Sequence, residues 1–304
     1  MLEAQQRDSI KQRDIEQVVL IGYGAKKKSD LTGSITALSE KDFNKGAITS
    51  AEGLLNGRTS GVVVTQSGTP GNDAVIRVRG GSSLLSSNDP LIVIDGLPVE
   101  GGLSSINPND IESFSILKDA SSTAIYGNRG SNGVILITTK KGSKKKLQVS
   151  FNSFTTYNTL AKNVDVYNGD QFREIINTMA PDKANLLGTA NTNWQDLIFR
   201  NTASFDSNLS LMGNLFDKIP SRLSIGHTEN EGLLLTSNYK RSTASFTLNP
   251  TLFDNHLKLN ISGNYTYAFR TNADEGAIGS AISYDPTQSP YDAQTPFAGY
   301  REWY

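Results

Sequence analysis

Residues 111–142 read IESFSILKDASSTAIYGNRGSNGVILITTKKG, and this stretch decides the fold of the first half of the chain. Residues 113–117 are rich in β-forming side chains, and Asp119 is placed to cap the N-terminus of a short helix that Gly127 would end. Residues 134–139 are an apolar run of strand length, which predicts burial on both faces. We therefore expect a compact βαβ-like unit in which two strands flank one helix.

The residues before this unit also combine short helices with short strands. A capping box formed by Thr49 and Glu52 predicts a helix over residues 51–56. Residues 61–66 and 75–79 have the composition of strands. The first half of the chain is therefore predicted to be one α+β domain.

The residues after position 143 alternate between apolar and polar side chains with a period of two. This pattern predicts β-strands of about 10 residues, each with one apolar face and one richly polar face. The apolar side chains of the predicted strands are Leu147, Val149 and Phe151, then Phe205, Leu209 and Leu211, then Ala244, Phe246 and Leu248, and finally Leu257, Leu259, Ile261, Tyr265, Tyr267 and Phe269.

Two architectures fit such strands: a membrane barrel with lipid outside and an aqueous lumen, and a soluble β-sandwich. Aromatic side chains near the predicted strand ends favour the barrel, because aromatic girdles mark membrane interfaces. Residues 145–269 supply only about five strands, whereas a barrel needs about eight to close. The predicted fold class is thus an α+β domain followed by antiparallel strands of an incomplete transmembrane β-barrel. The aromatic residues in question are Tyr157, Tyr239, Tyr265, Tyr267 and Phe269.

The composition narrows the classes of function. The chain has 304 residues, a net charge of -1 and no cysteine, which excludes disulfides and thiolate metal sites and argues against nucleic-acid binding. No apolar run reaches the ~18 residues of a transmembrane helix. The basic clusters at 26–28 and 140–146 are expected to be solvated turns.

No catalytic constellation stands out in the sequence. His227 and His256 fall in different predicted strands, and turn or cap positions explain Asp95 and Asp119. The glycine-rich turn at 127–133 follows a helix and precedes a strand, whereas a phosphate-binding loop needs the opposite order. We expect no enzyme activity, no metal site and no cofactor.

These segments together resemble the plug domain of TonB-dependent outer-membrane receptors, and specifically the SusC/RagA branch that imports glycans and peptides. Residues 111–142 resemble the end of the plug, residues 89–99 (DPLIVIDGLPV) one of its strands, and residues 18–24 (VVLIGYG) with 27–33 (KKSDLTG) its beginning. Residues 193–200 (NWQDLIFR) resemble a segment between early barrel strands. The resemblance therefore extends over almost the whole chain.

The resemblance implies four parts along the chain. Residues 1–14 would be a polar leader, residues 15–30 the TonB-box region and linker, residues 31–142 the plug, and residues 143–304 the first strands and loops of an outer-membrane β-barrel. The leader lacks the apolar core of a signal peptide, and an outer-membrane protein must be exported. The chain is therefore expected to be a processed or truncated part of a receptor.

The function implied by the resemblance is import across the cell outer membrane, energised by the inner-membrane proton-motive force through TonB and its motor complex. The implied partners are a SusD-like surface lipoprotein, a glycan or peptide substrate and outer-membrane lipid, and no nucleic acid is expected to bind. The alternative is a soluble periplasmic or cell-surface carbohydrate-binding protein, with an α+β domain and a β-sandwich.

The resemblance places the TonB box just before the plug, where β-forming residues could pair with TonB by adding a strand. The same residues could instead be the first strand of the plug. In the family, a serine-rich loop and the turn at 68–73 would face the extracellular side, which makes them candidates for ligand contact. The TonB-box candidates are Glu16, Gln17, Val18, Val19 and Leu20, and the ligand-facing loop candidates are Ser82, Ser83, Ser86 and Asn88.

Overall fold

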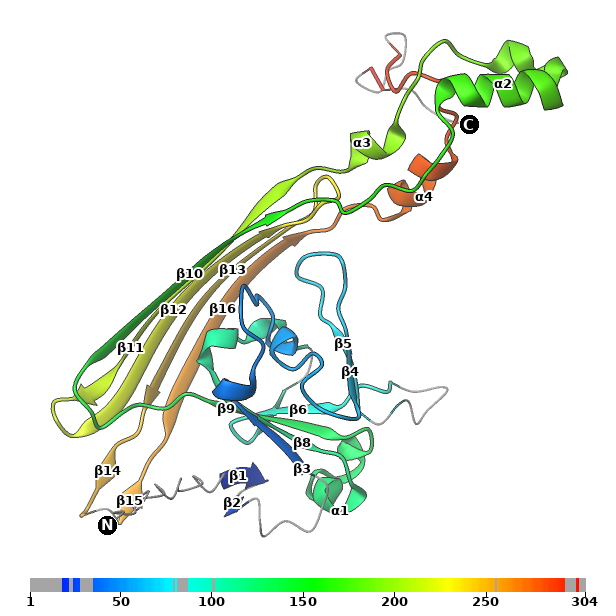
Figure 1. The fold of residues 1–304 in the computed structure, drawn as a ribbon. Helices are drawn as coiled ribbons and strands as arrows, with labels where there is room; N and C mark the ends of the chain where they lie inside the picture. Colours follow the sequence, from blue (N-terminus) through cyan, green and yellow to red (C-terminus); the bar gives the residue numbers. More distant parts are fainter. Residues whose placement is uncertain are drawn as a thin grey trace, which may run out of the picture.

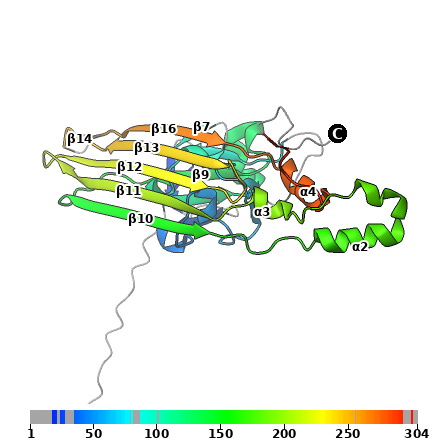
Figure 2. The same cartoon turned by 90° about the horizontal axis from the view of Figure 1, so that it is seen from above.

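The computed structural model describes residues 18–21, 24–27, 35–78, 80, 87–99, 102–254, 256–292 and 299–300. Its two main parts are a domain of short strands and helical turns and a long twisted sheet that lies against it (Figure 1). Figure 2 shows the strands of this sheet side by side, with helices beyond one end of it. No helix in the described part of the chain is long and apolar enough to cross a membrane.

The first domain is built on a mixed five-stranded sheet in the order β3-β8-β9-β6-β7. β9 pairs in parallel with β6 and antiparallel with β8, so the sheet belongs to an α+β domain, as the sequence predicts. The strands are β3 (Ile35–Ser39), β6 (Leu91–Ile94), β7 (Leu97–Val99), β8 (Ile111–Leu117) and β9 (Val134–Thr139).

The unit predicted over residues 111–142 has the expected parts, but its two strands are antiparallel. Helix α1 (Ala120–Thr123) is a single turn and is followed by the 3-10 turns of η6 (Ala124–Gly130). This short connection reverses the chain, so that Val134 pairs with Leu117, the last residue of β8. The βαβ-like expectation is therefore wrong in strand direction, because only a longer crossover returns the chain to start a parallel strand.

The predicted capping box is also replaced by a neighbouring cap. The 3-10 helix η3 (Ala51–Leu54) has Ser50 as its N-cap, and the Ser50 hydroxyl accepts a hydrogen bond from the Gly53 N–H at 3.4 Å. The N-cap is therefore Ser50 rather than Thr49. Glu52 is buried in the domain, which removes it from the surface position that a capping-box carboxylate usually has.

Apolar side chains pack on both faces of the mixed sheet. Ile135 and Ile137 of β9 belong to a larger cluster that includes Phe114 of β8. Val134 and Leu136 point the other way, into a smaller cluster. The prediction that this strand is buried on both faces is confirmed.

A separate hairpin covers one side of the larger cluster. Its strands are β4 (Val62–Thr65) and β5 (Val75–Val78), which pair antiparallel. Val62, Ile76 and Val78 contribute their side chains to the cluster. The hairpin is therefore part of the first domain, although it does not join the mixed sheet.

The second part is an antiparallel five-stranded sheet in sequence order, β10-β11-β12-β13-β16. This number agrees with the predicted strand count. β10 and β16 do not pair with each other in the described part of the chain, so the sheet is open at both edges. The strands are β10 (Gln148–Asn158), β11 (Thr202–Leu215), β12 (Ile219–Glu231), β13 (Asn238–Leu248) and β16 (Ile261–Thr271).

The buried face of this long sheet is its polar face. On β11, Asp206 and Asn208 are buried, whereas Phe205 and Leu209 on the opposite face are exposed. A soluble sandwich would bury the apolar face under a second sheet. Among the described residues no second sheet covers it, so the sandwich alternative does not fit, and the polarity is that of a barrel wall with lipid outside.

Four of the five predicted girdle aromatics lie on the exposed apolar face. They are Tyr157, Tyr265, Tyr267 and Phe269. Tyr239 is the exception, because its position in β13 has the parity of the polar face and its ring is buried. The assignment of Tyr239 to an interfacial girdle is therefore wrong.

Three helices lie beyond one end of the long sheet (Figure 1). α2 (Gly169–Met179) and α3 (Trp194–Ile198) belong to the connection between β10 and β11, and α4 (Gly276–Ser283) follows β16. Trp194 and Tyr284 pack edge to face, with ring centroids 5.5 Å apart. This contact joins the two connections at the same end of the sheet.

Asp95 gives a first prediction about stability. It has a φ of 49° in the turn between β6 and β7, and its carboxylate accepts hydrogen bonds from the Thr139 N–H at 2.9 Å and the Thr139 hydroxyl at 2.5 Å. Asp95→Ala should lower the free energy of unfolding by about 1–3 kcal/mol in urea titrations. Asp95→Asn keeps an acceptor and tolerates the positive φ, so it should lose less. Equal losses would contradict this account.

Candidate functional site

The first domain meets the long sheet mainly along residues 103–110, which we call the docking segment. It contains two 3-10 turns, η4 (Leu103–Ser105) and η5 (Pro108–Asp110). Asn107 caps the second turn, because its Oδ1 accepts a hydrogen bond from the Asn109 N–H at 2.9 Å. Such short turns leave carbonyl oxygens without helical partners, so these oxygens can accept hydrogen bonds from the sheet.

Arg241 of β13 binds these carbonyl oxygens. The side chain is buried, and its Nη1 donates hydrogen bonds to the carbonyl oxygens of Ser104 at 2.9 Å and Ile106 at 3.3 Å. Its Nη2 donates to the carbonyl oxygen of Thr49 at 2.9 Å. The planar guanidinium offers several donors in a fixed geometry. One side chain of the sheet therefore holds two separate parts of the first domain.

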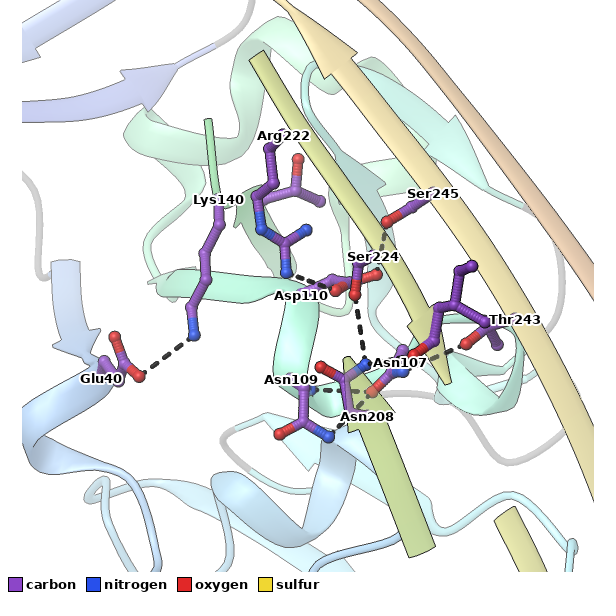
Figure 3. A network of polar contacts seen from close by, with 12 residues as sticks. Glu40, Asn107, Asn109, Asp110, Lys140, Asn208, Arg222, Ser224, Thr243 and Ser245 are labelled. Atoms are coloured by element: carbon purple, nitrogen blue, oxygen red, sulfur yellow. Dashed lines mark hydrogen bonds and ion pairs between the residues drawn. The ribbon is translucent and has the colours of Figure 1, made fainter. Parts of the chain in front are cut away.

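An ion pair lies beside this contact (Figure 3). Arg222 Nη2 is 2.7 Å from Asp110 Oδ1, and the two side chains are only 3% and 8% exposed. The Ser245 hydroxyl donates to Asp110 Oδ2 at 2.7 Å, and Asn107 Nδ2 donates to Thr243 Oγ1 at 3.1 Å. The docking segment is thus held against the long sheet by charged and neutral hydrogen bonds.

Two carboxylates lie close to the docking segment on the side of the first domain. Asp73 Oδ1 accepts a hydrogen bond from the Ser104 N–H at 3.1 Å. Glu52 is 1% exposed, and its Oε2 has no hydrogen-bond partner. Burial raises the pKa of the Glu52 carboxyl above its ordinary value, and the charge of Asp73 acts in the same direction. The charged form of Glu52 is therefore disfavoured in the folded domain.

A second contact involves the turn at 67–73. Gly71 has a φ of 76°, and the ring of Tyr239 lies so close that a Cβ on Gly71 would be 2.3 Å from Tyr239 Cδ2. Arg270 of β16 donates hydrogen bonds to the Gly71 carbonyl oxygen at 3.0 Å and to Asn72 Oδ1 at 2.7 Å. The buried Tyr239 is therefore a docking residue for this turn.

A pocket of about 280 Å³ lies between this turn and the ends of β10 and β12. Its lining is rich in hydroxyl and amide groups, it includes the carboxylate of Glu231, and none of its lining residues is basic. These groups can donate and accept hydrogen bonds without a strong demand for a charged ligand. The main polar side chains are Gln66, Ser67, Thr69, Asn72, Asn158 and Asn230.

A short link, residues 140–147, connects the first domain to β10. Gly142 lies tightly against β12, because a Cβ at this position would be 2.2 Å from the Ser221 nitrogen. The Gly142 N–H donates a hydrogen bond to Asn249 Oδ1 at 3.0 Å, and Ser143 bridges to Ser221. The link is therefore fixed to β12 of the long sheet near the middle of its own length.

Of the TonB-box candidates, Glu16 and Gln17 lie outside the described residues. The other three belong to strand β1 (Val18–Ile21), which forms an antiparallel hairpin with β2 (Gly24–Lys27). A strand paired in this way is compatible with both alternatives, the TonB box and the first strand of the plug. The TonB-box assignment stays a prediction.

Among the ligand-facing loop candidates, Ser82, Ser83 and Ser86 lie outside the described residues. Asn88 is half-buried. Its neighbour Ser87 accepts a hydrogen bond on its carbonyl oxygen from a side-chain amide of the η6–β9 turn, at 2.8 Å. A role of this loop in ligand contact stays a prediction.

The sequence interpretation did not single out Arg222 and Arg241. Both arginines occupy the buried polar parity of β12 and β13, so an arginine at a polar position of an alternating segment was the available signal. The pairing of Asp110 with Arg222 is likewise not indicated by the sequence pattern. The histidines lie elsewhere: His227 bonds to the hydroxyl of Ser242 at 3.0 Å.

Comparison with protein families and curated proteins gives three matches that agree. Residues 27–134 match the family described as the TonB-dependent Receptor Plug Domain. The chain is 47% identical over 295 residues to the TonB-dependent receptor SusC of Bacteroides thetaiotaomicron, covering 93% of the chain and 29% of that protein. It is 37% identical over 305 residues to a TonB-dependent receptor of Formosa agariphila, covering 95% of the chain and 30% of that protein. The chain thus spans less than a third of the length of these relatives.

Solved structures show the same fold. The structure of the RagAB peptide transporter matches with a TM-score of 0.70 and 25% identity, covering 80% of the chain and 31% of the matched chain. The ferric citrate transporter FecA matches with a TM-score of 0.54 and 15% identity, covering 79% of the chain and 32% of the matched chain. At that identity the second match speaks for the fold alone.

The buried ion pair of the docking segment gives a second prediction. Asp110→Ala leaves the Arg222 charge buried without a partner, which should lower the free energy of unfolding by about 3–5 kcal/mol in urea titrations of the detergent-solubilised protein. Asp165→Ala removes a carboxylate from the exposed pair of Lys162 and Asp165 and should cost only about 0–1 kcal/mol. Similar losses in the two variants would contradict a structural role for the buried pair.

Glu52 gives a third prediction, on pH dependence. The folded-state pKa of Glu52 lies above the ordinary value of 4.5. The neutral carboxyl therefore makes its full contribution to the free energy of unfolding below pH 4.5, and this contribution is lost as the pH rises through the folded-state pKa. Glu52→Gln should therefore raise the thermal midpoint at pH 7 and flatten the loss of stability above pH 4.5.

Asp42 serves as the control for this prediction. Hydrogen bonds from the Ser39 N–H and hydroxyl hold the pKa of Asp42 below its ordinary value. Asp42→Asn should therefore lower the thermal midpoint at pH 7 and have a smaller effect in acid, which is the opposite sign. A shift of the same sign in both variants would refute the assignment for Glu52.

Proposed function

Because the chain belongs to the TonB-dependent receptors of the SusC/RagA type, we propose that it forms the plug and the first barrel strands of an outer-membrane importer. In this proposal residues 31–142 are the plug and residues 143–304 belong to the barrel, while residues 1–14 are a leader and 15–30 the TonB-box region. The role is transport, not catalysis. The single observation that carries it is the polar contact between the docking segment and the inner face of the sheet.

A polar contact suits a plug that must move. Hydrogen bonds to water can replace those between the docking segment and Arg241 when the two parts separate. Separation of an apolar contact of similar size would expose surface that water cannot satisfy. The contact therefore positions the plug in the resting state and still allows its displacement by force.

The force would come from the inner-membrane proton-motive force through TonB and its motor complex. Residues 16–20 would pair with TonB as an added strand, which transmits a pull through main-chain hydrogen bonds. Figure 1 shows the β1–β2 hairpin far from α2 and α4. This separation is what a receptor needs if TonB acts on one side of the membrane and substrate arrives on the other.

For the substrate we favour a glycan over a peptide. The pocket beside the turn at 67–73 presents mainly hydroxyl and amide groups with one carboxylate, that of Glu231, and such groups match the hydroxyl groups of a sugar. Peptide termini and side chains would call for more charged partners than this lining offers. A SusD-like surface lipoprotein would act as the partner that retains the glycan over the plug.

The exposed apolar face of the long sheet weighs against the soluble carbohydrate-binding alternative. Phe246 on β13 and Tyr265 on β16 lie on this face, and both are exposed. A contiguous apolar face of this extent in water would cause aggregation. Outer-membrane lipid is the natural contact for it.

The test is binding of the periplasmic domain of TonB, by calorimetry, to the detergent-solubilised chain and to its Val19→Pro variant. Proline removes a main-chain donor from the pairing strand, so affinity should fall at least roughly tenfold. Val19→Thr keeps the β-propensity and the donor, and should bind like the unchanged chain. Equal binding by the proline variant would refute the TonB box at residues 16–20.

A further inference from the structure

Two turns at the same end of the long sheet carry the same three residues. Leu215, Phe216 and Asp217 stand where β11 turns into β12. The same triplet recurs at residues 252–254, between β14 (Thr251–Leu252) and β15 (Leu257–Lys258). Both turns lie at the end of the sheet opposite α2 and α4 (Figure 1). The same three-residue turn sequence therefore occurs twice at this end of the sheet.

Both turns hold phenylalanine in a backbone conformation that it rarely adopts. Phe216 and Asp217 have φ angles of 51° and 57°, and Phe253 and Asp254 have 51° and 50°. Glycine, asparagine and aspartate accept this left-handed region, whereas a bulky side chain is unfavourable there. A tight turn alone would favour Asn-Gly, so turn formation does not explain a phenylalanine at these positions.

The two phenylalanine side chains are also far more exposed than an aromatic ring normally is in water. Phe216 is 81% exposed and Phe253 is 75% exposed. Exposed apolar side chains lie beside both rings: Leu215 of β11 next to Phe216, and Leu252 and Leu257 of the separate β14–β15 hairpin next to Phe253. The tips therefore extend the proposed lipid-facing surface rather than interrupt it.

Lysine residues surround these tips. Residues 144–146 are three exposed lysines that immediately precede β10, and Gln148 of β10 pairs with Met212 near the end of β11. Lys218 and Lys258 follow the two turns and are exposed. The turns also carry two aspartates, so these five lysines and two aspartates together have a net charge of +3.

We propose that this end of the sheet binds the phosphate headgroups of anionic glycerophospholipids, with Phe216 and Phe253 inserted at the boundary between headgroups and acyl chains. The inference rests on the proposed placement of the sheet in a membrane. Aromatic rings favour this boundary, and lysines near a membrane surface gain from anionic lipid. The two tips would thus anchor the wall in the leaflet on the TonB side.

The combination of groups argues for lipid over other occupants. A soluble polyanion would use the lysines but not the exposed rings. A protein partner could pack against the rings. However, the rings lie at the margin of an apolar face that is proposed to contact lipid, where a lipid contact already accounts for them. Continuity with that face and the opposite charge of the headgroups both match an anionic bilayer surface.

The first experiment measures depth in nanodiscs that contain phosphatidylcholine with and without phosphatidylglycerol. The chain has no cysteine, so nitroxide labels can be placed in it at single positions through Phe216→Cys, Phe253→Cys and Leu223→Cys. Labels at 216 and 253 should be shielded from a water-soluble relaxation agent and accessible to oxygen. Leu223 lies on the exposed apolar face of β12 and reports on membrane placement itself.

The three labels separate the two possible failures. If the label at 223 is in lipid but those at 216 and 253 are in water, the anchor is refuted and the proposed membrane placement stands. If all three labels are in water, the placement itself is wrong. A label at Leu235, in the loop between β12 and β13 at the opposite end, gives the reference for the other interface.

The second experiment measures retained phosphatidylglycerol by native mass spectrometry. The variant Phe216→Gly with Phe253→Gly suits the left-handed backbone, so its thermal midpoint in detergent should stay the same or rise. Its retention of the anionic lipid should nevertheless fall. Changing Lys144, Lys145 and Lys146 to Gln should weaken retention by roughly fivefold per lysine. Unchanged retention in both variants would overturn the proposal.

Discussion

The structure depends on one constraint, which is that the inner face of the long sheet is polar. Its outer face is apolar, so the first domain can dock only through hydrogen bonds and charges. Arg222 and Arg241 supply the charged donors to the docking segment, because each extends from the long sheet to groups of that segment. The short 3-10 turns of that segment follow from the same need, since they present unpaired carbonyl oxygens to a guanidinium.

A buried polar contact of this kind determines the position of the docked domain more than the free energy of docking. A buried ion pair contributes little more than apolar groups of the same volume would, but it penalises any position in which one charge loses its partner. Asp110 and Arg222 therefore define where the plug sits more than how tightly it is held. Glu52 does not add to stability either. Its buried carboxyl, whose pKa is raised, lowers the stability of the docked domain near neutral pH.

The sequence was sufficient for features that depend on local pattern. The apolar run of β9 and the period-two alternation after residue 143 predict buried and two-faced strands, and the structure has both. The sequence was insufficient where contacts between residues far apart in the chain determine the local structure. Ser50 replaces Thr49 as a cap, Tyr239 turns inward onto Gly71, and β9 runs antiparallel to β8.

The partner of Arg241 illustrates the limit most clearly. Its acceptors in the first domain are main-chain oxygens more than 130 residues away, and every residue type has such an oxygen. No side-chain pattern in the sequence could therefore identify them. The parity of the strand indicates only that an arginine points inward, and the packing of the two parts decides what it meets.

The link at residues 140–147 sets a limit on the travel of the plug. Eight extended residues span roughly 27 Å, and Gly142 is fixed against Ser221 near the middle of that length. While Gly142 stays in place, only the few link residues before it can extend. A displaced plug would then be limited to rotation about this point of the long sheet. Its freedom grows only when Gly142 is released from β12. In the proposed transport cycle, the link would keep a displaced plug close to its docked position, so that its return would be a movement over a short distance.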